Sequence, residues 1–295
     1  MKLLKLALLF VLLSHACFGV MIRHDVSESK YLDLANQAGL HAGLVRIPDA
    51  RGDFSGVLLG PRHILTCGHP ILGFLPDGKN EGRVSIAVQV RGKAYQAEYA
   101  WLHPRYNRST HCGGGDLAVL RLTKSVLGTI PARLFSGQIR LGQIFIGVGQ
   151  GKSGTGKDNN EPLPMGTFRG YANTIDFLFD ESELALFRSD FDDGSDGANT
   201  LARIVYGPTN LDIRGTSSKT PLSIEGSPAA GDSGSGVFVQ KGNDLWLVGI
   251  TSYRYYSMYG GQAGFANLTH SANRDWLNGI ARSEKAVFGE NVTPR

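Results

Sequence analysis

Several features are scarce in this sequence, and each shortage excludes a class of protein. The 30 lysines and arginines are scattered among 26 acidic residues and form no basic run, so a nucleic-acid partner is not expected. Charged residues make up only 19% of the chain against 42% hydrophobic residues, a balance typical of a globular rather than a disordered protein. No stretch after residue 19 is long and apolar enough to span a bilayer, and no internal repeat is visible.

The start of the chain has the composition of a targeting segment. Positive residues precede an apolar run at 6–13 that is too short to span a membrane, and small residues follow it. We therefore expect a signal peptide over residues 1–19, cleaved after Ala16 or after Gly19, and a secreted or periplasmic protein. No membrane association is expected unless a lipid is attached at Cys17, and the protein is expected to be a monomer.

Cysteine is rare, with three residues in the chain of 295. Removal of a signal peptide that ends at Gly19 leaves Cys67 and Cys112, and an even pair in an exported chain indicates a disulfide. The alternative is two free thiols. No metal and no cofactor are expected.

Glycine, in contrast, is abundant: 39 residues, well above the usual ~7% of a chain, which favours a fold rich in turns. Short apolar runs separated by Gly, Pro and Asp recur along the chain and predict an all-β fold, a sandwich or a barrel. Ser271 is the expected N-cap of a C-terminal helix. The segment 139–149 opens a second β-rich half. The expected strands lie at residues 44–47, 54–59, 63–66, 84–90, 95–102, 117–122, 237–239 and 245–252, and the expected helices at 29–37 and 271–281.

Two polar segments are expected to be loops. Residues 151–161 are rich in Gly, Lys and Asn. Residues 190–197 are acidic and rich in glycine, which suits either a solvated loop or a calcium site built from clustered carboxylates. Both interpretations of the second segment stay open on the sequence alone.

The motif that carries chemistry is Gly231-Asp232-Ser233-Gly234-Ser235-Gly236, followed by an apolar strand. Glycine accepts backbone angles that other residues avoid, so such a turn can hold Ser233 Oγ in a cleft and aim backbone N–H groups at one point. An exposed nucleophile and donors for an oxyanion are what acyl transfer needs. The motif therefore predicts a nucleophilic serine, although the same composition is also typical of plain turns.

A base and an acid stand in suitable contexts elsewhere in the chain. His69 lies just past the expected strand 63–66, and Asp116 lies at the mouth of the apolar strand 117–122. Imidazole titrates near neutral pH and can accept a hydroxyl proton, and a buried carboxylate on its other ring nitrogen fixes the tautomer. Together His69, Asp116 and Ser233 predict a catalytic triad.

In this order and these contexts, the chain resembles the chymotrypsin/trypsin-like serine protease family, from about Leu44 to Leu277. His69 ends Leu-Thr-Cys-Gly-His, similar to the family's T-A-A-H, Asp116 opens Asp-Leu-Ala-Val-Leu, close to D-I-A-L-L, and Ser233 lies in Gly-Asp-Ser-Gly-Ser, close to G-D-S-G-G. The resemblance implies Ser233 as nucleophile, His69 as general base and then acid, and Asp116 as orienting acid. It also implies two six-stranded antiparallel β-barrels packed around a central cleft, with a C-terminal helix.

Other site residues are implied by their positions in the family pattern. The backbone N–H groups of Gly231 and Ser233 are the expected oxyanion hole, and Asp232 is a candidate partner for the N-terminal amino group. The substrate pocket is expected to be lined by Ser227, Ser252, Tyr253, Arg254 and Gly264.

The chain departs from the family pattern in two respects that concern the first barrel and activation. Pro70 stands where the family has Cys, and Cys67 and Cys112 fall beside the histidine and the aspartate instead, so the resemblance places a bridge between them behind the dyad. No start similar to Ile-Val-Gly-Gly lies between residues 20 and 44. Signal cleavage at Val20 or nearby is one way to supply the amino group, and a different partner for the acid is the other.

The residue preference is only partly readable. Ser227, at the expected base of the pocket, is not an acid, so a preference for Lys or Arg is not expected, and an uncharged or apolar residue is expected before the scissile bond. The family usually has Gly where Arg254 stands. A cation there would block part of the pocket, recruit an acidic group of the substrate, or point to solvent.

The expected function is a secreted serine endopeptidase that acts on protein or peptide substrates through an acyl-enzyme. Two alternatives stay open: a protease-like fold without proteolytic activity that serves as a binding module, and an esterase that uses the same triad. The expected organisation is a signal peptide at 1–19, an N-terminal segment at 20–43, a first β-barrel at 44–130, a second at 131–270, and a C-terminal helix and tail at 271–295.

Overall fold

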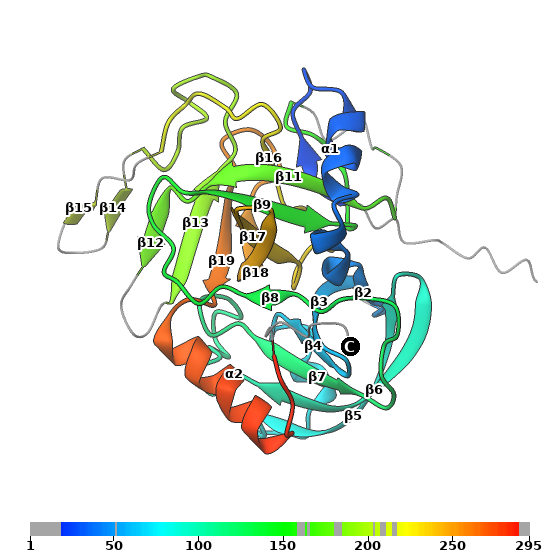
Figure 1. Cartoon of the computed structure of the whole chain (residues 1–295). Helices are drawn as coiled ribbons and strands as arrows, with labels where there is room; N and C mark the ends of the chain where they lie inside the picture. The colour runs from blue at the N-terminus through cyan, green and yellow to red at the C-terminus, as the bar shows by residue number, and fades with distance from the viewer. Residues whose placement is uncertain are drawn as a thin grey trace, which may run out of the picture.

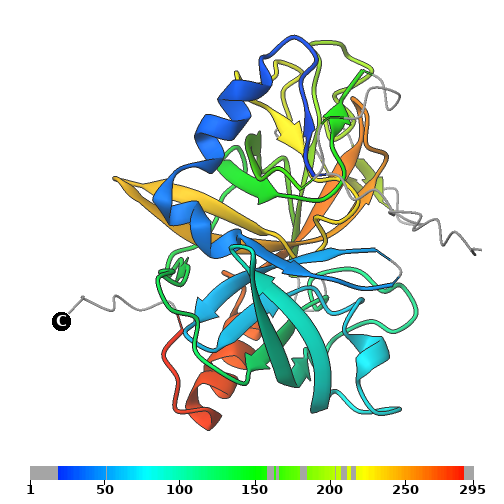
Figure 2. The same cartoon turned by 90° about the vertical axis from the view of Figure 1, so that its right-hand side faces the viewer.

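The computed structural model of the chain describes residues 19–50, 52–157, 163, 166–179, 185–202, 204–206, 211–213 and 217–288. The expected signal peptide, Cys17 included, therefore lies outside the described residues apart from Gly19. The described part is mostly β-structure, arranged as two units stacked one upon the other (Figure 1). The view from the side shows the same two layers, with the helix at the C-terminal end beside the lower one (Figure 2).

The first unit is a closed six-stranded antiparallel barrel. Its strands follow the order β2-β3-β4-β7-β6-β5, and the pairing of Val45 with Val90 closes the ring. Its interior is filled by fully buried aliphatic side chains, among them Val57, Leu65 and Val119. All six strands expected between residues 44 and 122 are confirmed. Their bounds are β2 Val45–Ile47, β3 Phe54–Gly60, β4 His63–Thr66, β5 Glu81–Val90, β6 Lys93–Leu102 and β7 Ala118–Leu122.

The second unit is built on an eight-stranded sheet. Seven strands follow the order β11-β9-β17-β18-β19-β13-β12, and the short β8 pairs in parallel with β18. Its core is aromatic: the ring of Phe145 lies 5.2 Å from Phe265 and 6.2 Å from Tyr171, centroid to centroid, in edge-on contacts. The bounds are β8 Arg133–Leu134, β9 Ile144–Gly149, β11 Arg169–Thr174, β12 Phe177–Phe179, β13 Leu186–Asp190, β17 Gly236–Lys241, β18 Asp244–Tyr255 and β19 Gln262–Asn267.

This sheet is a half-barrel where a second closed barrel was expected. Closure requires the two edge strands to pair with each other, and within the described residues β11 and β12 do not. The chain at residues 224–225 covers the outer edge of β11 instead: Ala172 N donates to Ile224 O at 3.0 Å, and Ala172 forms an isolated bridge with Glu225. An edge that is already covered in this way cannot accept the other end of the sheet.

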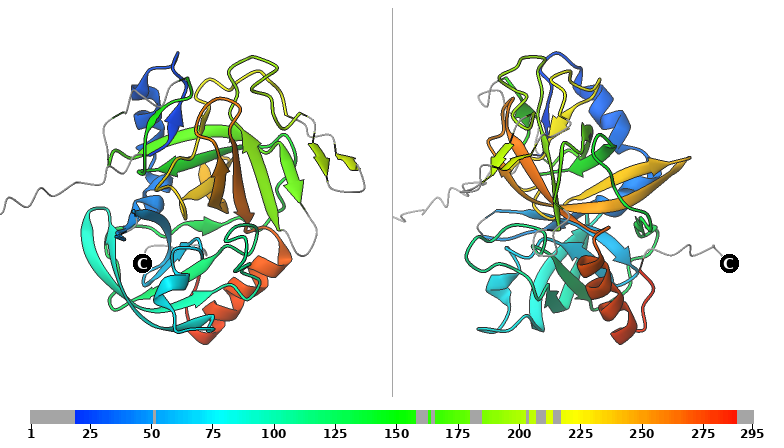
Figure 3. Two further views of the ribbon diagram at one scale, coloured as in Figure 1. Left: turned by 180° about the vertical axis from the view of Figure 1, so that it is seen from behind. Right: turned by 90° about the vertical axis from the view of Figure 1, so that its left-hand side faces the viewer.

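Short elements link the start of the chain to the second unit. A three-stranded sheet joins β1 Met21–Ile22 to β10 Gly154–Thr155 and β16 Gly226–Ser227. The expected loop at 151–161 thus contains a strand, β10. A hairpin of β14 Ile204–Tyr206 and β15 Leu211–Ile213 lies at the periphery of the second unit (Figure 3).

The helices cover the outside of the β-structure. The helix α2 packs back on the barrel, where Asn273 Nδ2 donates to Gly114 O at 3.1 Å. Its N-cap is His270, whose Nδ1 accepts from Ala272 N, and not Ser271 as expected. No helix in the described part of the chain is long and apolar enough to cross a membrane. The helical segments are α1 Glu28–Ala35 and α2 Ser271–Ser283, with 3-10 turns η1 Ala38–Gly43 and η2 Leu72–Phe74.

Candidate active site

His69 and Asp116 come together because β4 and β7 are neighbours in the barrel. Thr66 of β4 pairs with Ala118 of β7, so the turn after β4 and the residue before β7 lie at one end of the barrel. His69 Nδ1 is 2.9 Å from Asp116 Oδ2. The backbone N–H groups of Gly68 and His69 both donate to Asp116 Oδ1 at 2.8 Å. The acid therefore holds the imidazole in one orientation.

A third side chain holds the acid from the second unit. Ser252 Oγ, on β18, donates to Asp116 Oδ2 at 2.6 Å, and Gly113 N donates to Ser252 Oγ at 3.1 Å. Asp116 is only 1% exposed, and four hydrogen bonds satisfy its two oxygens. Ser252 was expected to line the substrate pocket. No sequence signal indicates its contact with an acid 136 residues away, because only the packing of the two units creates it.

The protonation of His69 follows from these contacts. Burial lowers the pKa of the imidazole, but the neighbouring Cys67 and the hydrogen bond to Asp116 outweigh it and raise the pKa of His69 above its ordinary value. Burial in turn raises the pKa of the Cys67 thiol, whereas the charge of His69 lowers it. As a general base His69 must first lose that proton, so rising pH favours its reactive form.

The glycine-rich turn that carries Ser233 lies against the barrel beside His69. Ser55 N, on β3, donates to Ser233 O at 2.8 Å. A Cβ added to Gly234 would come within 2.2 Å of Thr66 Oγ1, and Gly234 has a φ of +87°, so both the space and the backbone require glycine. The turn therefore places Ser233 at the end of the barrel where the dyad lies.

The two reactive atoms are not hydrogen-bonded to each other. Ser233 is half-buried, and its Oγ makes no hydrogen bond to another described residue. His69 Nε2 faces Cys67 Sγ at 3.9 Å instead. Completion of the triad needs a side-chain movement at Ser233 or His69, and catalytic hydrogen bonds often tighten only when the substrate is bound.

Two backbone donors of the turn are unused. The N–H groups of Gly231 and Ser233 have no acceptor among the described residues, whereas those of Asp232 and Gly234 are bonded to backbone carbonyls at 3.0 and 2.8 Å. Gly231 has a φ of +96°, and its carbonyl accepts from Ser55 Oγ at 2.9 Å, which fixes the peptide. The expected oxyanion donors are therefore available for a ligand.

Asp232 is fully buried, and its carboxylate accepts hydrogen bonds from backbone N–H groups. Val20 N and Ala229 N donate to Oδ2, and Gly151 N donates to Oδ1, each at 2.9 Å. Burial raises the pKa of Asp232, whereas these hydrogen bonds lower it. Val20 is itself 0% exposed, and a Cβ on Gly19 would come within 2.4 Å of Gly151 N. The beginning of the described chain is thus seated directly on the acid beside the nucleophile.

The sequence matches no protein-family model and no curated protein. Any functional conclusion for this chain therefore rests on the geometry of the site itself.

The residues expected to line the substrate pocket are not all brought together. Ser227 is 3% exposed and pairs with Met21 in the small sheet. Tyr253 covers Gly264, because a Cβ at Gly264 would come within 2.3 Å of the tyrosine ring. Arg254 is half-buried and donates through Nη1 to Ser257 Oγ. Of these five residues, only Tyr253 lines the cavity that opens beside the dyad.

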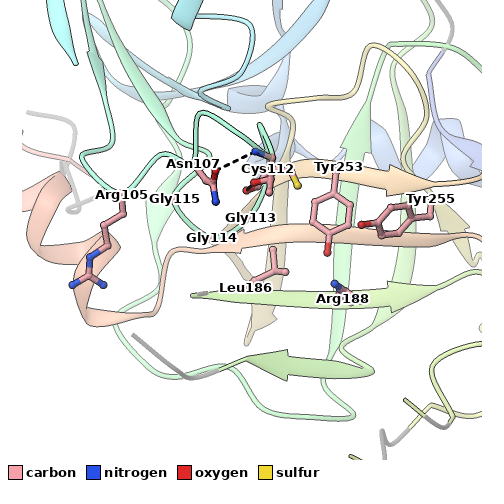
Figure 4. A pocket seen from close by; sticks show the side chains of 11 residues that line it. Arg105, Asn107, Cys112, Gly113, Gly114, Gly115, Leu186, Arg188, Tyr253 and Tyr255 are labelled. Atoms are coloured by element: carbon pink, nitrogen blue, oxygen red, sulfur yellow. Dashed lines mark hydrogen bonds between the residues drawn. The ribbon is translucent and has the colours of Figure 1, made fainter. Parts of the chain in front are cut away.

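A cavity of about 560 Å³ opens beside the dyad on the face of Tyr253 (Figure 4). Its wall contains two cations, Arg105 and Arg188, and no acidic residue. The guanidinium carbon of Arg188 lies 5.7 Å from the centre of the Tyr253 ring. The remaining lining is Asn107, Thr110, Cys112, Gly113, Gly114, Gly115, Leu186 and Tyr255.

The expected disulfide between Cys67 and Cys112 is not formed, and both thiols are free. Cys67 is buried at the end of β4 with its Sγ toward His69, whereas Cys112 lies in the wall of the cavity. The two thiols therefore face different surroundings.

The acidic segment 190–197 begins with the last residue of β13 and continues as a loop, and some of its carboxylates accept hydrogen bonds from protein donors. Asp190 Oδ2 accepts from Leu201 N at 2.6 Å, and Asp193 Oδ1 accepts from Ser195 N at 2.8 Å. In the described part of the chain, the group of ligand atoms close enough to hold a metal is elsewhere: Cys67, His69 and Asp116, within 4.8 Å of one another. The structure thus favours the loop interpretation over a calcium site.

Proposed function

We propose that the protein is a serine endopeptidase. The observation that supports this most strongly is the Asp116–His69 pair, which Ser252 holds in place at one end of the barrel. The turn that carries Ser233 packs against the same end of the barrel, and the N–H groups of Gly231 and Ser233 have no acceptor among the described residues. A buried acid on an imidazole, a serine on a rigid glycine turn and two idle donors are the components that acyl transfer needs.

In the proposed reaction, Ser233 Oγ attacks the peptide carbonyl while His69 Nε2 takes its proton. The Asp116 carboxylate, 2.9 Å from Nδ1, stabilises the imidazolium. The N–H groups of Gly231 and Ser233 donate to the oxyanion of the tetrahedral intermediate. His69 then gives its proton to the leaving amine, which departs and leaves an acyl-enzyme. Water, activated by His69, hydrolyses this ester and restores Ser233.

We also propose membership of the chymotrypsin/trypsin-like family, with the half-barrel as counterpart of its second barrel. The positions of the dyad on the closed barrel, of the serine turn on the second unit, and of the C-terminal helix support this. Secretion or export to the periplasm, and action on protein or peptide substrates, belong to the same proposal.

The N-terminal contact supports a proposal for activation. Cleavage after Gly19 would convert Val20 N from an amide into an ammonium without moving it from Asp232 Oδ2, which is 2.9 Å away. Removal of the signal peptide would then be the activating cut, and no separate activation sequence would be needed.

A fluorophosphonate probe tests the proposed function, because it reacts covalently with an activated serine. Labelling of the mature protein is expected, with a loss of about three orders of magnitude or more in Ser233→Ala and in His69→Ala. Ser85→Ala, at an exposed position of β5, is the matched control and should label like the parent. Equal labelling of the parent and Ser233→Ala would refute the proposal.

The alternative of a binding module without activity is supported by one observation, the 3.9 Å contact of His69 Nε2 with Cys67 Sγ in place of Ser233. Complete absence of labelling in a folded, mature protein would favour it. An esterase would label but would hydrolyse small esters and not peptides.

A further inference from the structure

Arg254 is a cation without a carboxylate partner close to the dyad. It lies on β18, two residues after Ser252, and is half-buried. Its guanidinium donates to the neutral Ser257 Oγ, and within the described residues it forms no ion pair. Arginine stays protonated in proteins, so the charge remains when the side chain loses water. A partly buried charge of this kind is costly until an anion reaches it.

Asp232 does not serve as the counter-ion. Its charge acts on Arg254 and raises the guanidinium's pKa, while burial lowers that pKa by more. Both carboxylate oxygens are already held by backbone N–H groups at 2.9 Å. The guanidinium of Arg254 can therefore pair with an anion that comes from outside the described part of the chain.

An extended peptide can reach Arg254 along the open edge of β18. The neighbour β17 pairs with β18 only as far as Ile250, whereas Tyr253 to Tyr255 pair with β19 on the opposite side. The edge from Ser252 to Tyr255 is thus unpaired among the described residues, and unpaired edges accept peptide strands. Because Ser252 is bonded to Asp116, this edge begins at the dyad.

The surroundings of this edge carry the same sign of charge. The adjoining cavity contains Arg105 and Arg188 and no acidic side chain in its wall. In Figure 4, Arg188 lies beneath the tip of Tyr253; it belongs to β13, whose partner β19 pairs in turn with β18. Among the described residues, the wall of this cavity therefore contains no acidic side chain that would compete with a substrate carboxylate for Arg254.

We propose that Arg254 binds a substrate carboxylate and that the enzyme cleaves after Glu or Asp. This replaces the uncharged residue expected from the sequence, and it rests on the proposed peptidase function. The acidic residue is placed directly before the scissile bond because the charge of Asp232, the neighbour of Ser233 in the chain, acts on the Arg254 guanidinium, which puts this cation on the nucleophile's side of β18.

Peptides that differ only at the residue before the scissile bond test the proposal. The parent enzyme should cleave the Glu peptide with a kcat/KM roughly 10- to 100-fold above the Gln peptide, the range expected for a hydrogen-bonded charge pair. Arg254→Gln should bring this ratio near one. Arg254→Lys should keep part of the preference, and Arg140→Gln, at an exposed site, should change nothing.

A ratio that Arg254→Gln leaves unchanged would overturn the assignment, as would a parent enzyme without preference for Glu. A gain on Gln and Ala peptides in Arg254→Gln, with no preference in the parent, would show that the arginine obstructs the cleft. A requirement for acid two or three residues earlier would place the carboxylate on Arg105 or Arg188 and also overturn the proposal.

A binding measurement separates this inference from the proposed activity. A peptide that ends in Glu should bind the Ser233→Ala protein more tightly than one that ends in Gln, and high salt and Arg254→Gln should both remove the difference. If the probe fails to label the protein but the Glu peptide still binds selectively, the peptidase proposal is wrong and the carboxylate site remains. If the protein is labelled and cleaves peptides but does not prefer the Glu peptide in binding, the carboxylate site is wrong and the peptidase proposal remains.

Discussion

Asp232→Asn, made in a chain that starts at Val20 and in one that keeps Gly19, tests how the nucleophile turn is held. Asn can keep one oxygen toward Val20 N and Ala229 N, the pair that shares Oδ2. Its amide nitrogen then meets Gly151 N, which leaves one buried donor unsatisfied. This costs about 1–3 kcal/mol of unfolding free energy in either form of the chain.

In the chain that starts at Val20, Asp232→Asn lowers the unfolding free energy by a further amount. Its ammonium would be buried with the 0% exposed Val20 and would face a neutral amide in place of the Asp232 carboxylate. Removal of one partner of a buried ion pair costs about 3–5 kcal/mol. The penalty of Asp232→Asn should therefore be about 2 kcal/mol larger in the chain that starts at Val20 than in the chain that keeps Gly19.

Urea unfolding of the four proteins at pH 7 measures this difference as a double-mutant cycle. Probe labelling in parallel should fall more steeply with Asp232→Asn in the Val20 form, because the turn that presents Ser233 relaxes. Asp77→Asn, at an exposed position, is the control and should cost under 0.5 kcal/mol or so in both forms. Equal penalties in the two forms would refute the idea that an ammonium occupies this place.

Two further predictions concern the acid's brace and a set of buried carboxyls. Ser252→Ala removes the 2.6 Å hydrogen bond to Asp116 and should lower kcat roughly tenfold with little change in KM, and an effect on KM alone would contradict a positioning role. Burial raises the pKa of Asp176 to about 9, of Asp192 to about 8 and of Glu225 to about 7. These folded-state values exceed the unfolded values near 4, so the stability that the protonated forms contribute is full below about pH 4 and is lost as pH rises through 7–9. Urea unfolding from pH 5 to 9 should show this decline, Asp176→Asn should flatten it, and an unchanged slope in that variant would count against the assignment.

Local features of the fold were readable from the sequence because they depend on residues close together in the chain. The six strands of the barrel, and the position of His69 after one and Asp116 before another, follow from apolar runs bounded by turn residues. Their meeting was expected from the resemblance to the family alone, because nothing in the apolar runs indicates that β4 and β7 are neighbours. The half-barrel was not, because the covering of β11 by the chain near Glu225 has no local signature.

The sequence by itself determined which side chains can do chemistry and which turns can carry them. Ser233 lies between Gly231 and Gly234, which both have a positive φ that other residues disfavour, so the choice of glycine at these two positions is visible in the sequence. Only the tertiary structure decided that Ser252 braces the acid, that Cys67 and Cys112 stay apart, and that Arg254 lacks a carboxylate partner among the described residues. These outcomes depend on how two units pack and on which groups lose water together, and contacts across more than a hundred residues leave no pattern in a single chain.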